Sequence, residues 1–148
     1  MRTRTSALLF CEDAASMACE FCDGTWRGDL VLEDETGSVI LHEDWSPRGH
    51  AMVVSKRHLQ NASDLGALEW EALASLYRRA ERAVLEATGR ERAIMLKLGI
   101  QVPHLHIHIY PANASHDRAA VMAMMDGKAR DERDPSFVER VRHAMIRR

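Results

Sequence analysis

Three histidines alternate with apolar residues in the segment Pro103-His104-Leu105-His106-Ile107-His108-Ile109-Tyr110-Pro111. Successive side chains of a β-strand point to opposite faces, so His104, His106 and His108 would share one face. The apolar residues between and after them would then face the core: Leu105, Ile107 and Ile109. Three imidazoles in a row contribute little to folding, because an unpaired polar group inside a protein is costly. The segment therefore indicates chemistry.

The simplest interpretation is an edge strand whose polar face happens to be histidine. Three imidazoles at period two, between two prolines, make that a poor account. Two chemical interpretations remain open from the residues alone. All three histidines could be metal ligands, or one could be a nucleophile tuned by its neighbours, because imidazole binds metals and exchanges protons near neutral pH.

A second candidate for chemistry is the close pair Cys19 and Cys22, which has Cys-x-x-Cys spacing. Two thiolates at this spacing can bind one metal ion, and structural zinc sites are normally closed by two further Cys or His ligands. The chain has 3 cysteines, an odd number that a reducing compartment would keep as thiols, so a disulfide framework is not expected. The alternative is two buried, reduced cysteines acting as small hydrophobic residues. We expect zinc.

Length and composition limit the class of protein. The 148 residues suit one domain, 1–148, whose single core can bury about two thirds of the unfolded surface. Hydrophobic residues make up 46% and charged residues 28%, which is typical of a globular protein and argues against disorder or a coiled coil. The net charge of -2 argues against a general nucleic-acid binder, whose usual mark is a basic surface.

Membrane and secretion signals are not found in the sequence. No apolar run approaches the roughly twenty residues that cross a bilayer. The basic residues at the start of the chain, Met1–Thr5, precede too short an apolar stretch for a secretory signal. We therefore expect a cytoplasmic protein with no membrane partner.

The elements that would position these residues follow from hydrophobic patterning. Residues 30–34 and 38–42 are predicted to form a hairpin around Glu35-Thr36-Gly37, a tight turn with its glycine. After a break at Pro47-Arg48-Gly49, residues 50–55 are predicted to form a third strand. Residues 93–98 are predicted to form a fourth strand, and the histidine segment a fifth.

One helix is predicted before the last two strands in the sequence, and another is predicted after them. Apolar residues recur every three or four positions between Ser63-Asp64, either of which could cap a helix, and Gly89, which would end it. The members of this apolar stripe are Leu65, Leu68, Ala72, Leu76, Ala80 and Ala83. Met122, Met124 and Met125 are predicted to lie in an irregular segment at the edge of the core. A C-terminal helix should start at Asp134-Pro135, with aspartate as N-cap and proline at the first helical position.

Together these elements predict an α+β fold. An antiparallel sheet of about five strands would carry the long helix on one face, and a C-terminal helix would follow. The sequence has no repeat and no linker that would mark a second domain.

The histidine segment resembles the signature of the histidine-triad (HIT) superfamily. Other parts of the chain agree in order and spacing: the Cys-x-x-Cys pair, the segment Gly49-His50-Ala51-Met52-Val53-Val54-Ser55-Lys56-Arg57-His58, the long helix and the strand before the triad. The resemblance covers residues 19–111 and leaves residues 112–148 as a C-terminal extension. It implies a HIT-like fold.

The resemblance also implies a metal site. Zinc-bearing members of this superfamily use the cysteine pair, the histidine of the Lys-x-His element and the first triad histidine, which correspond to Cys19, Cys22, His58 and His104 here. A structural zinc at these residues would tie the N-terminal segment to the histidine strand and fix its first imidazole.

The resemblance implies that the middle histidine, His106, is the nucleophile. It would attack the α-phosphorus of a nucleotide and form a covalent nucleotidyl-histidine, which water then cleaves. Neutral imidazole is nucleophilic at physiological pH, so two easier displacements replace one hard one. The attacking nitrogen must be unprotonated, which requires the other ring nitrogen to donate a hydrogen bond, and a main-chain carbonyl is the expected acceptor.

Two further histidines have implied catalytic roles. His108 would bond a phosphoryl oxygen or protonate the leaving atom. Nucleotidyltransferases of the superfamily tend to carry glutamine at this third position, so histidine favours a hydrolase. His50 matches the upstream histidine that completes the imidazole network in related proteins.

The chain departs from the family pattern at the phosphate and ribose positions. Related proteins place Ser, Thr or Asn in the loop before the triad, where Gln101 would substitute as a donor to the phosphate. The arginine often found after the closing proline is absent, since Ala112-Asn113 follow. Asp44 or Glu43 would supply the acidic residue that binds the ribose hydroxyls. No role is evident for His42, His116 and His143.

The leading hypothesis is a HIT-type hydrolase or phosphoramidase acting on a purine nucleotide conjugate. A dinucleoside polyphosphate hydrolase belongs to the same class. The alternatives are a metal-dependent hydrolase that uses the histidine cluster and a non-catalytic nucleotide-binding protein. Resemblance to the Hint and Fhit branches implies a homodimer.

Overall fold

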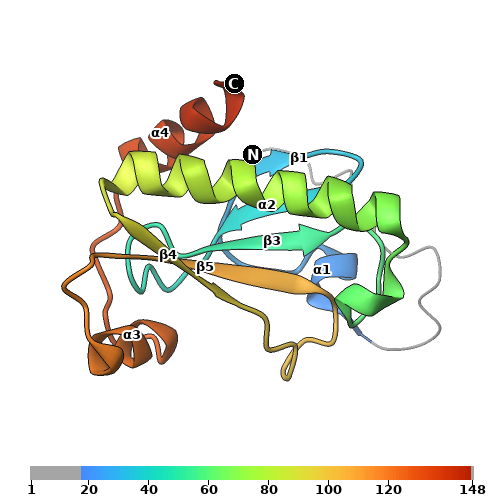
Figure 1. Ribbon diagram of the computed structural model, residues 1–148, viewed down its shortest axis with the longest axis horizontal. Helices are drawn as coiled ribbons and strands as arrows, with labels where there is room; N and C mark the ends of the chain where they lie inside the picture. Colours follow the sequence, from blue (N-terminus) through green and yellow to red (C-terminus); the bar gives the residue numbers. More distant parts are fainter. Residues whose placement is uncertain (1–17, 148) are drawn as a thin grey trace.

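The structure is a computed structural model that describes residues 18–147 (Figure 1). Residues 1–17, which the sequence predicts not to form a secretory signal, lie outside the described residues. Five strands form one antiparallel sheet in the order β1-β2-β3-β5-β4. Their bounds are Asp29–Glu33 (β1), Gly37–Leu41 (β2), Ala51–Ser55 (β3), Arg92–Leu96 (β4) and His106–Ala112 (β5). The predicted fold class is therefore confirmed.

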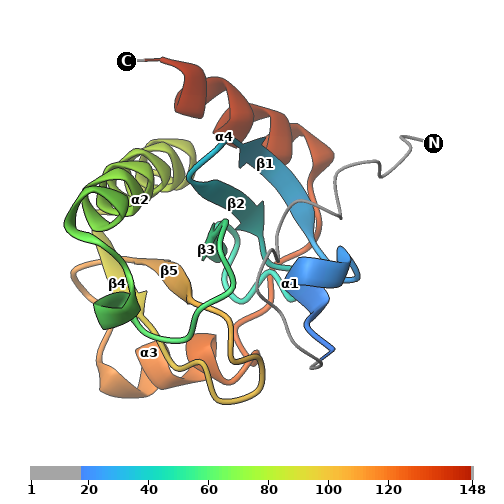
Figure 2. The same cartoon turned by 90° about the vertical axis from the view of Figure 1, so that its right-hand side faces the viewer.

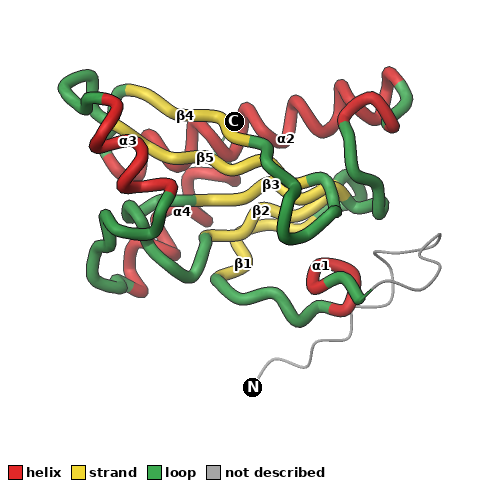
Figure 3. The backbone as a smooth tube through the Cα atoms, turned by 90° about the horizontal axis from the view of Figure 1, so that it is seen from below, coloured by secondary structure: helices red, strands yellow, loops and turns green. Residues whose placement is uncertain are grey.

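Helices cover both faces of the sheet (Figure 2). The long helix α2 (Ala67–Thr88) and the C-terminal helix α4 (Pro135–Ile146) pack against each other and against one face. The short helices α1 (Glu20–Asp23) and α3 (Arg118–Met125) lie on the opposite side of the sheet, as Figure 3 also shows. Among residues 18–147, none of the helices has the length and hydropathy of a transmembrane span.

The two faces of the sheet have different cores, as the alternation of side chains in a strand requires. On the α2 face, Leu105, Ile107 and Ile109 join one large core with residues of α2 and α4. This confirms the predicted inward set. On the opposite face, Ile40, Met52 and Val54 pack against Phe21 of α1 and the two cysteines. The histidines of β5 lie on this second face, because they alternate with the inward residues.

Pairing in the sheet places the histidines in its middle. β5 lies between β3 and β4, with His108 opposite Met52 and His106 opposite Val54 on β3. β5 begins at His106, three residues after the start of the histidine segment at Pro103, so His104 precedes the strand. The backbone of Leu105 instead donates a hydrogen bond to the Leu59 carbonyl at 2.6 Å. The histidine strand is therefore held on both edges.

The first hairpin forms, but its connection is residues 34–36, and Gly37 is the first residue of β2 rather than part of the turn. A Cβ on Gly37 would stand 2.1 Å from the carbonyl oxygen of Val54, so only glycine fits against β3 there. The predicted C-terminal helix is also confirmed, because the side chain of its N-cap Asp134 accepts a hydrogen bond from the Ser136 amide. Four of its apolar residues are buried as expected: Phe137, Val138, Val141 and Met145.

Two helix predictions were wrong in detail. Ser63 and Asp64 belong to a short 3-10 turn capped by Asn61, and α2 starts at Ala67 after Gly66. Two predicted members of the stripe, Leu68 and Ala72, are exposed, because the helix turns a different face towards the sheet. The buried face of α2 is Leu73, Leu76, Tyr77, Ala80, Ala83 and Val84.

The methionine segment is not irregular. Residues 118–125 form α3, whose N-cap Asp117 accepts a hydrogen bond from the Ala120 amide. Met124 is buried against Tyr110, whereas Met122 is exposed. The three methionines alone gave no helical period, and the Asp cap was the signal that the prediction missed.

Candidate active site and metal centre

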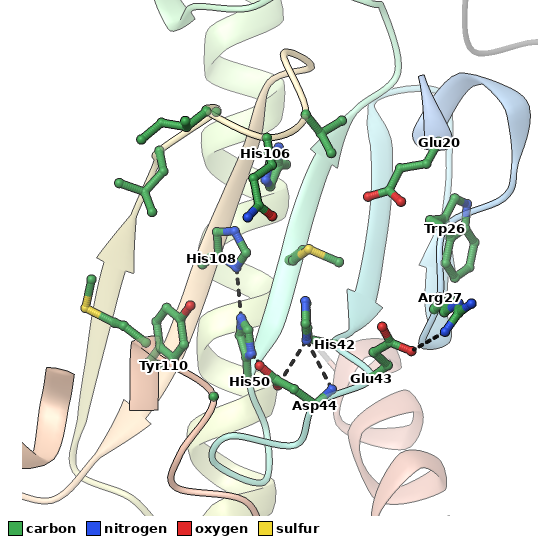
Figure 4. A pocket seen from close by; sticks show the side chains of 18 of the residues that line it. Glu20, Trp26, Arg27, His42, Glu43, Asp44, His50, His106, His108 and Tyr110 are labelled. Atoms are coloured by element: carbon green, nitrogen blue, oxygen red, sulfur yellow. Dashed lines mark hydrogen bonds and ion pairs between the residues drawn. The ribbon is translucent and has the colours of Figure 1, made fainter. Parts of the chain in front are cut away.

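The histidine face of the sheet opens into a cavity of about 820 Å³ (Figure 4). His106 and His108 line it from β5, and His50 lines it from the residue before β3. Glu20 and Phe21 of α1 form one wall. The loop before the triad, 98–102, and residues 125–130 after α3 form others. The pocket thus lies on the side of the sheet away from α2.

His106 has the tautomer that a nucleophile requires. Its Nδ1 lies 2.6 Å from the carbonyl oxygen of His104. A carbonyl can only accept, so Nδ1 carries the proton and Nε2 is left with the lone pair. Burial lowers the pKa of His106 below its usual value, which favours the neutral ring. The expected hydrogen bond to a main-chain carbonyl is confirmed.

His108 and His50 form a chain that ends at Asp44 (Figure 4). Nδ1 of His108 lies 2.8 Å from Nε2 of His50, and Nδ1 of His50 lies 2.8 Å from Oδ1 of Asp44. The carboxylate accepts, so Nδ1 of His50 donates and its Nε2 accepts from His108 when the ring is neutral. The three side chains therefore have defined donor and acceptor roles.

Electrostatics favour neutral rings and an ionised acid in this chain. Burial, followed by the charges of neighbouring histidines, lowers the pKa of His108 to about 3. Burial also lowers the pKa of His50, against the effect of Asp44. Burial alone would raise the pKa of Asp44, but hydrogen bonds with His42 and His50 outweigh it and hold the pKa well below the usual range. The negative charge of the chain thus resides on Asp44.

His42 lies in the site, although no role for it was evident from the sequence. Its ring stacks on that of His50 with centroids 4.3 Å apart, and its Nδ1 lies 3.0 Å from Oδ1 of Asp44. It lines the cavity. The available signal was its position at the end of a predicted strand, two residues before the candidate acid. His116 and His143 do not line the pocket.

The two acidic candidates have different surroundings. Asp44 is bonded to His50, whereas Glu43 lies 3.9 Å from Arg27 at the exposed rim of the pocket. Both line the cavity, as does Gln101 in the loop before β5. The structure therefore brings Gln101 and Asp44 into the pocket of His106. It also adds Arg130, a cation from the C-terminal extension.

The four predicted metal ligands come together on the same side of the sheet. The sulfurs of Cys19 and Cys22 and one nitrogen each of His58 and His104 all lie within 4.8 Å of one another. Nε2 of His104 donates to the Ser55 carbonyl at 2.8 Å, so its Nδ1 is unprotonated and faces the sulfurs. Burial lowers the pKa of His104 to about 4, so the ring is neutral. Two sulfurs and two imidazole nitrogens suit a tetrahedral zinc ion.

Redox state matters for this cluster. The sulfur of Cys22 lies 3.2 Å from Nδ1 of His58 and 3.6 Å from Nδ1 of His104. Only thiolates ligate zinc, so both cysteines can act as ligands only in their reduced form.

A second group of potential ligands, His42, Asp44 and His50, lies in the pocket. Its atoms already bond to one another, and Oδ1 of Asp44 also accepts from the Ser46 amide at 3.0 Å. This group is therefore satisfied by hydrogen bonds.

Solved structures of several other proteins are similar to this one. A Zn-bound histidine triad family protein from Mycobacterium smegmatis is similar, with a TM-score of 0.64 and 24% identity over 88% of this chain and 95% of that one. A hypothetical histidine triad nucleotide-binding protein from Sulfolobus tokodaii has a TM-score of 0.62 and 21% identity over 86% of this chain and 87% of that one. A histidine triad protein from Sinorhizobium meliloti has a TM-score of 0.61 and 19% identity over 78% of this chain and 88% of that one. These likenesses establish the fold.

Family membership rests on the sequence match. Residues 25–115, more than half of the chain, match the HIT domain. This range contains both strands of the histidine network and His58. The chain therefore belongs to the HIT domain family.

Proposed function

We propose that this protein is a nucleotide hydrolase that acts at the α-phosphate of a purine nucleotide conjugate through a covalent nucleotidyl-His106. The observation that supports this most is the 2.6 Å hydrogen bond from Nδ1 of His106 to its neighbouring carbonyl. That bond leaves Nε2 as the unprotonated nitrogen of a neutral ring that lines the cavity.

In the first step, Nε2 of His106 attacks the α-phosphorus. A nitrogen–phosphorus bond forms while the bond from phosphorus to the leaving group breaks. The leaving atom takes a proton from Nε2 of His108, so an amine departs neutral. The products are the nucleotidyl-enzyme and the free leaving group.

The Asp44–His50–His108 chain supplies the proton donor. Without substrate the pKa of His108 is about 3, so the ring is neutral. A phosphate anion beside the ring favours its protonated form, and His50 accepts from Nδ1 with the Asp44 carboxylate behind it. The relay thus stabilises the imidazolium when substrate is bound.

In the second step, water attacks the same phosphorus. Its proton passes to Nε2 of His108, the bond to His106 breaks and the nucleoside monophosphate leaves. His106 regains its lone pair and His108 its proton, so the cycle is balanced. Histidine at the third position of the triad supports hydrolysis over nucleotidyl transfer.

The metal at Cys19, Cys22, His58 and His104 is proposed to be a structural zinc. Four protein ligands fill a tetrahedron and leave no open position for a substrate, and three of the residues are nearly inaccessible to solvent. Because this site has no open position and His104 is its only member from the triad, it does not support a hydrolase in which the triad holds a catalytic metal. When bound, the ion fixes the ring of His104, whose carbonyl accepts from His106.

A homodimer is also proposed. β4 lies at the edge of the sheet, and Met95 on it is 58% exposed. Light scattering at several protein concentrations tests this, and a mass of one chain at all of them would refute it.

A substrate panel tests the activity. Adenosine phosphoramidate, a p-nitrophenyl ester of AMP and diadenosine polyphosphates are each incubated with the wild type and with His106→Asn. We expect the wild type to hydrolyse at least one of them and the variant to lose activity by about 10³-fold or more. His143→Gln, an exposed histidine on α4, is the matched control and should retain full activity. Near-wild-type turnover by His106→Asn would refute the proposal.

A further inference from the structure

The loop that carries Asp44 is held in an unusual conformation. Trp45, directly after Asp44, has a φ of +49°, a left-handed conformation that is unfavourable for a bulky residue. Its side chain is only 3% exposed and packs against Phe137 of α4, with ring centroids 5.6 Å apart. Such a conformation persists only where surrounding contacts impose it. The contacts around this loop therefore decide where Asp44 lies.

Ser46 supplies the first of these contacts. Its side chain is completely buried, and its Oγ donates to the Met124 carbonyl at 2.9 Å. The same Oγ accepts from the Ala129 amide at 3.1 Å. One hydroxyl thus joins the loop both to the last turn of α3 and to the segment that follows it.

Asp131 supplies a second pair of contacts. Its amide donates to the Trp45 carbonyl at 2.9 Å, and its Oδ2 accepts from the Arg48 amide at 2.7 Å. Asp131 therefore fixes the backbone on both sides of Ser46. Neither Asp131 nor Ser46 lines the cavity.

These contacts lead directly to the histidine chain. The Ser46 amide donates to Oδ1 of Asp44 at 3.0 Å, and that same oxygen accepts from His50. A displacement of Ser46 would move the acceptor of His50 and hence the ring that contacts His108. The segment that holds Ser46 lies outside residues 25–115, which match the family domain.

We propose that residues 124–131 form a brace that positions the Asp44–His50–His108 relay, with Ser46 and Asp131 as positioning residues. The inference rests on the proposed function of that relay in protonating the leaving group. It assigns the C-terminal extension a part in catalysis that does not require contact with substrate.

Leaving-group dependence provides the test. An amine must be protonated to leave phosphorus, whereas p-nitrophenolate leaves without a proton. A displaced relay should therefore slow hydrolysis of an AMP amide much more than hydrolysis of the p-nitrophenyl ester. A protein that is merely less stable would lose both activities in proportion.

Ser46→Ala and Asp131→Ala are compared with Asp131→Asn, which keeps an acceptor oxygen, and with Arg142→Met. Arg142 also ties the C-terminal region to the sheet, through a 2.7 Å hydrogen bond to the Leu30 carbonyl, but lies away from the pocket. We expect both alanine variants to lower kcat/KM for the amide by about tenfold or more and kcat/KM for the ester by less than about twofold. The comparison uses kcat/KM because this quantity reports the first step, whereas proton transfer from water in the second step is common to both substrates. Asp131→Asn should recover most of the loss, and Arg142→Met should leave the amide-to-ester ratio unchanged.

A proton NMR measurement separates this proposal from the proposed function. The Nδ1 proton of His50, donated to Asp44, should give a downfield signal that disappears in His50→Gln. We expect the signal to be lost or shifted in Ser46→Ala and retained in Arg142→Met. An unchanged signal together with an unchanged amide-to-ester ratio would overturn the brace. A wild type inactive on both substrates would refute the proposed function, and the NMR signal alone would then decide whether the brace positions His50.

Discussion

His50 joins Asp44 to His108, because its two ring nitrogens lie 2.8 Å from Oδ1 of Asp44 and 2.8 Å from Nδ1 of His108. His50 is only 2% exposed, so these contacts lie out of water and are stronger than they would be at the surface. The geometry makes the carboxylate act on His108 through an intervening ring.

Asp44→Asn tests this relation. An amide in place of the carboxylate can donate to His50 and reverse its tautomer, so that Nε2 no longer accepts from His108. We expect kcat on an AMP amide to fall by a factor of about 100. Steady-state kinetics with the amide and with the p-nitrophenyl ester measure the effect.

The same experiment separates the relay from a role in ribose binding. If Asp44 acted by binding ribose hydroxyls, KM would rise for ribonucleotide substrates while kcat changed little. That result, with equal effects on amide and ester, would contradict the relay.

The stability of the fold should depend on pH through His50 and His108. Burial holds the pKa of both rings below the usual 6.5, and that of His108 falls to about 3. The unfolded chain therefore takes up protons first as the pH falls. The free energy of unfolding therefore has its full value, as far as these two rings decide it, above pH 6.5. It declines as the pH drops from 6.5 towards 3. Urea unfolding at several pH values measures the trend.

His108→Asn provides the control for this dependence. Asparagine does not titrate, so the decline in the free energy of unfolding between neutral and acid pH should be smaller in the variant. Both proteins carry the same four candidate metal ligands, so any pH dependence that these ligands cause cancels in the comparison. Equal slopes in the two proteins would show that His108 does not cause the decline.

Zinc should bind to the reduced protein at the Cys19 cluster. We expect about one zinc per chain after treatment with a reductant, and a fall in Tm of about 10 °C or more on removal by a chelator, because structural zinc contributes directly to folding. Elemental analysis and thermal unfolding measure the two effects.

Cys19→Ser is the matched variant for this prediction. Its Tm should already be low and should not respond to the chelator. A wild type that binds no zinc after reduction, or whose Tm is the same with and without the ion, would rule out a structural zinc.

His42 should support the site by stacking on His50. His42→Phe keeps an aromatic ring at this position and removes the nitrogen near Asp44, whereas His42→Ala removes both contacts. We expect kcat/KM to fall about fivefold in His42→Phe and by about tenfold or more in His42→Ala. If both variants kept the wild-type kcat/KM, His42 would have no part in catalysis.

The sequence predicted the alternation of the histidine strand, and the resemblance predicted that Cys19, Cys22, His58 and His104 lie together. Alternation in a strand places His106 and His108 on one face whatever the rest of the chain does. Contacts between residues far apart in the sequence could not be predicted from spacing. The pairing of His50 with His108 was expected from resemblance, but the position of Asp44 behind His50 depends on the conformation of Trp45.

The C-terminal extension was the largest omission. Three methionines without a clear period hid α3, and nothing in residues 124–131 marks them as neighbours of Ser46. Their role depends on backbone hydrogen bonds, such as that from the Ala129 amide, which no side-chain pattern reveals. For the same reason the cation at Arg130 could not be placed near the pocket from sequence.

The central claim is that His106 becomes covalently attached to the nucleotide. Wild-type protein is mixed with an AMP amide, quenched in denaturant before the steady state, and digested for mass spectrometry. The account predicts that the peptide containing His106 gains the mass of one AMP moiety, and that His106→Asn gains none. An adduct on another residue, or the same turnover by His106→Asn, would contradict it.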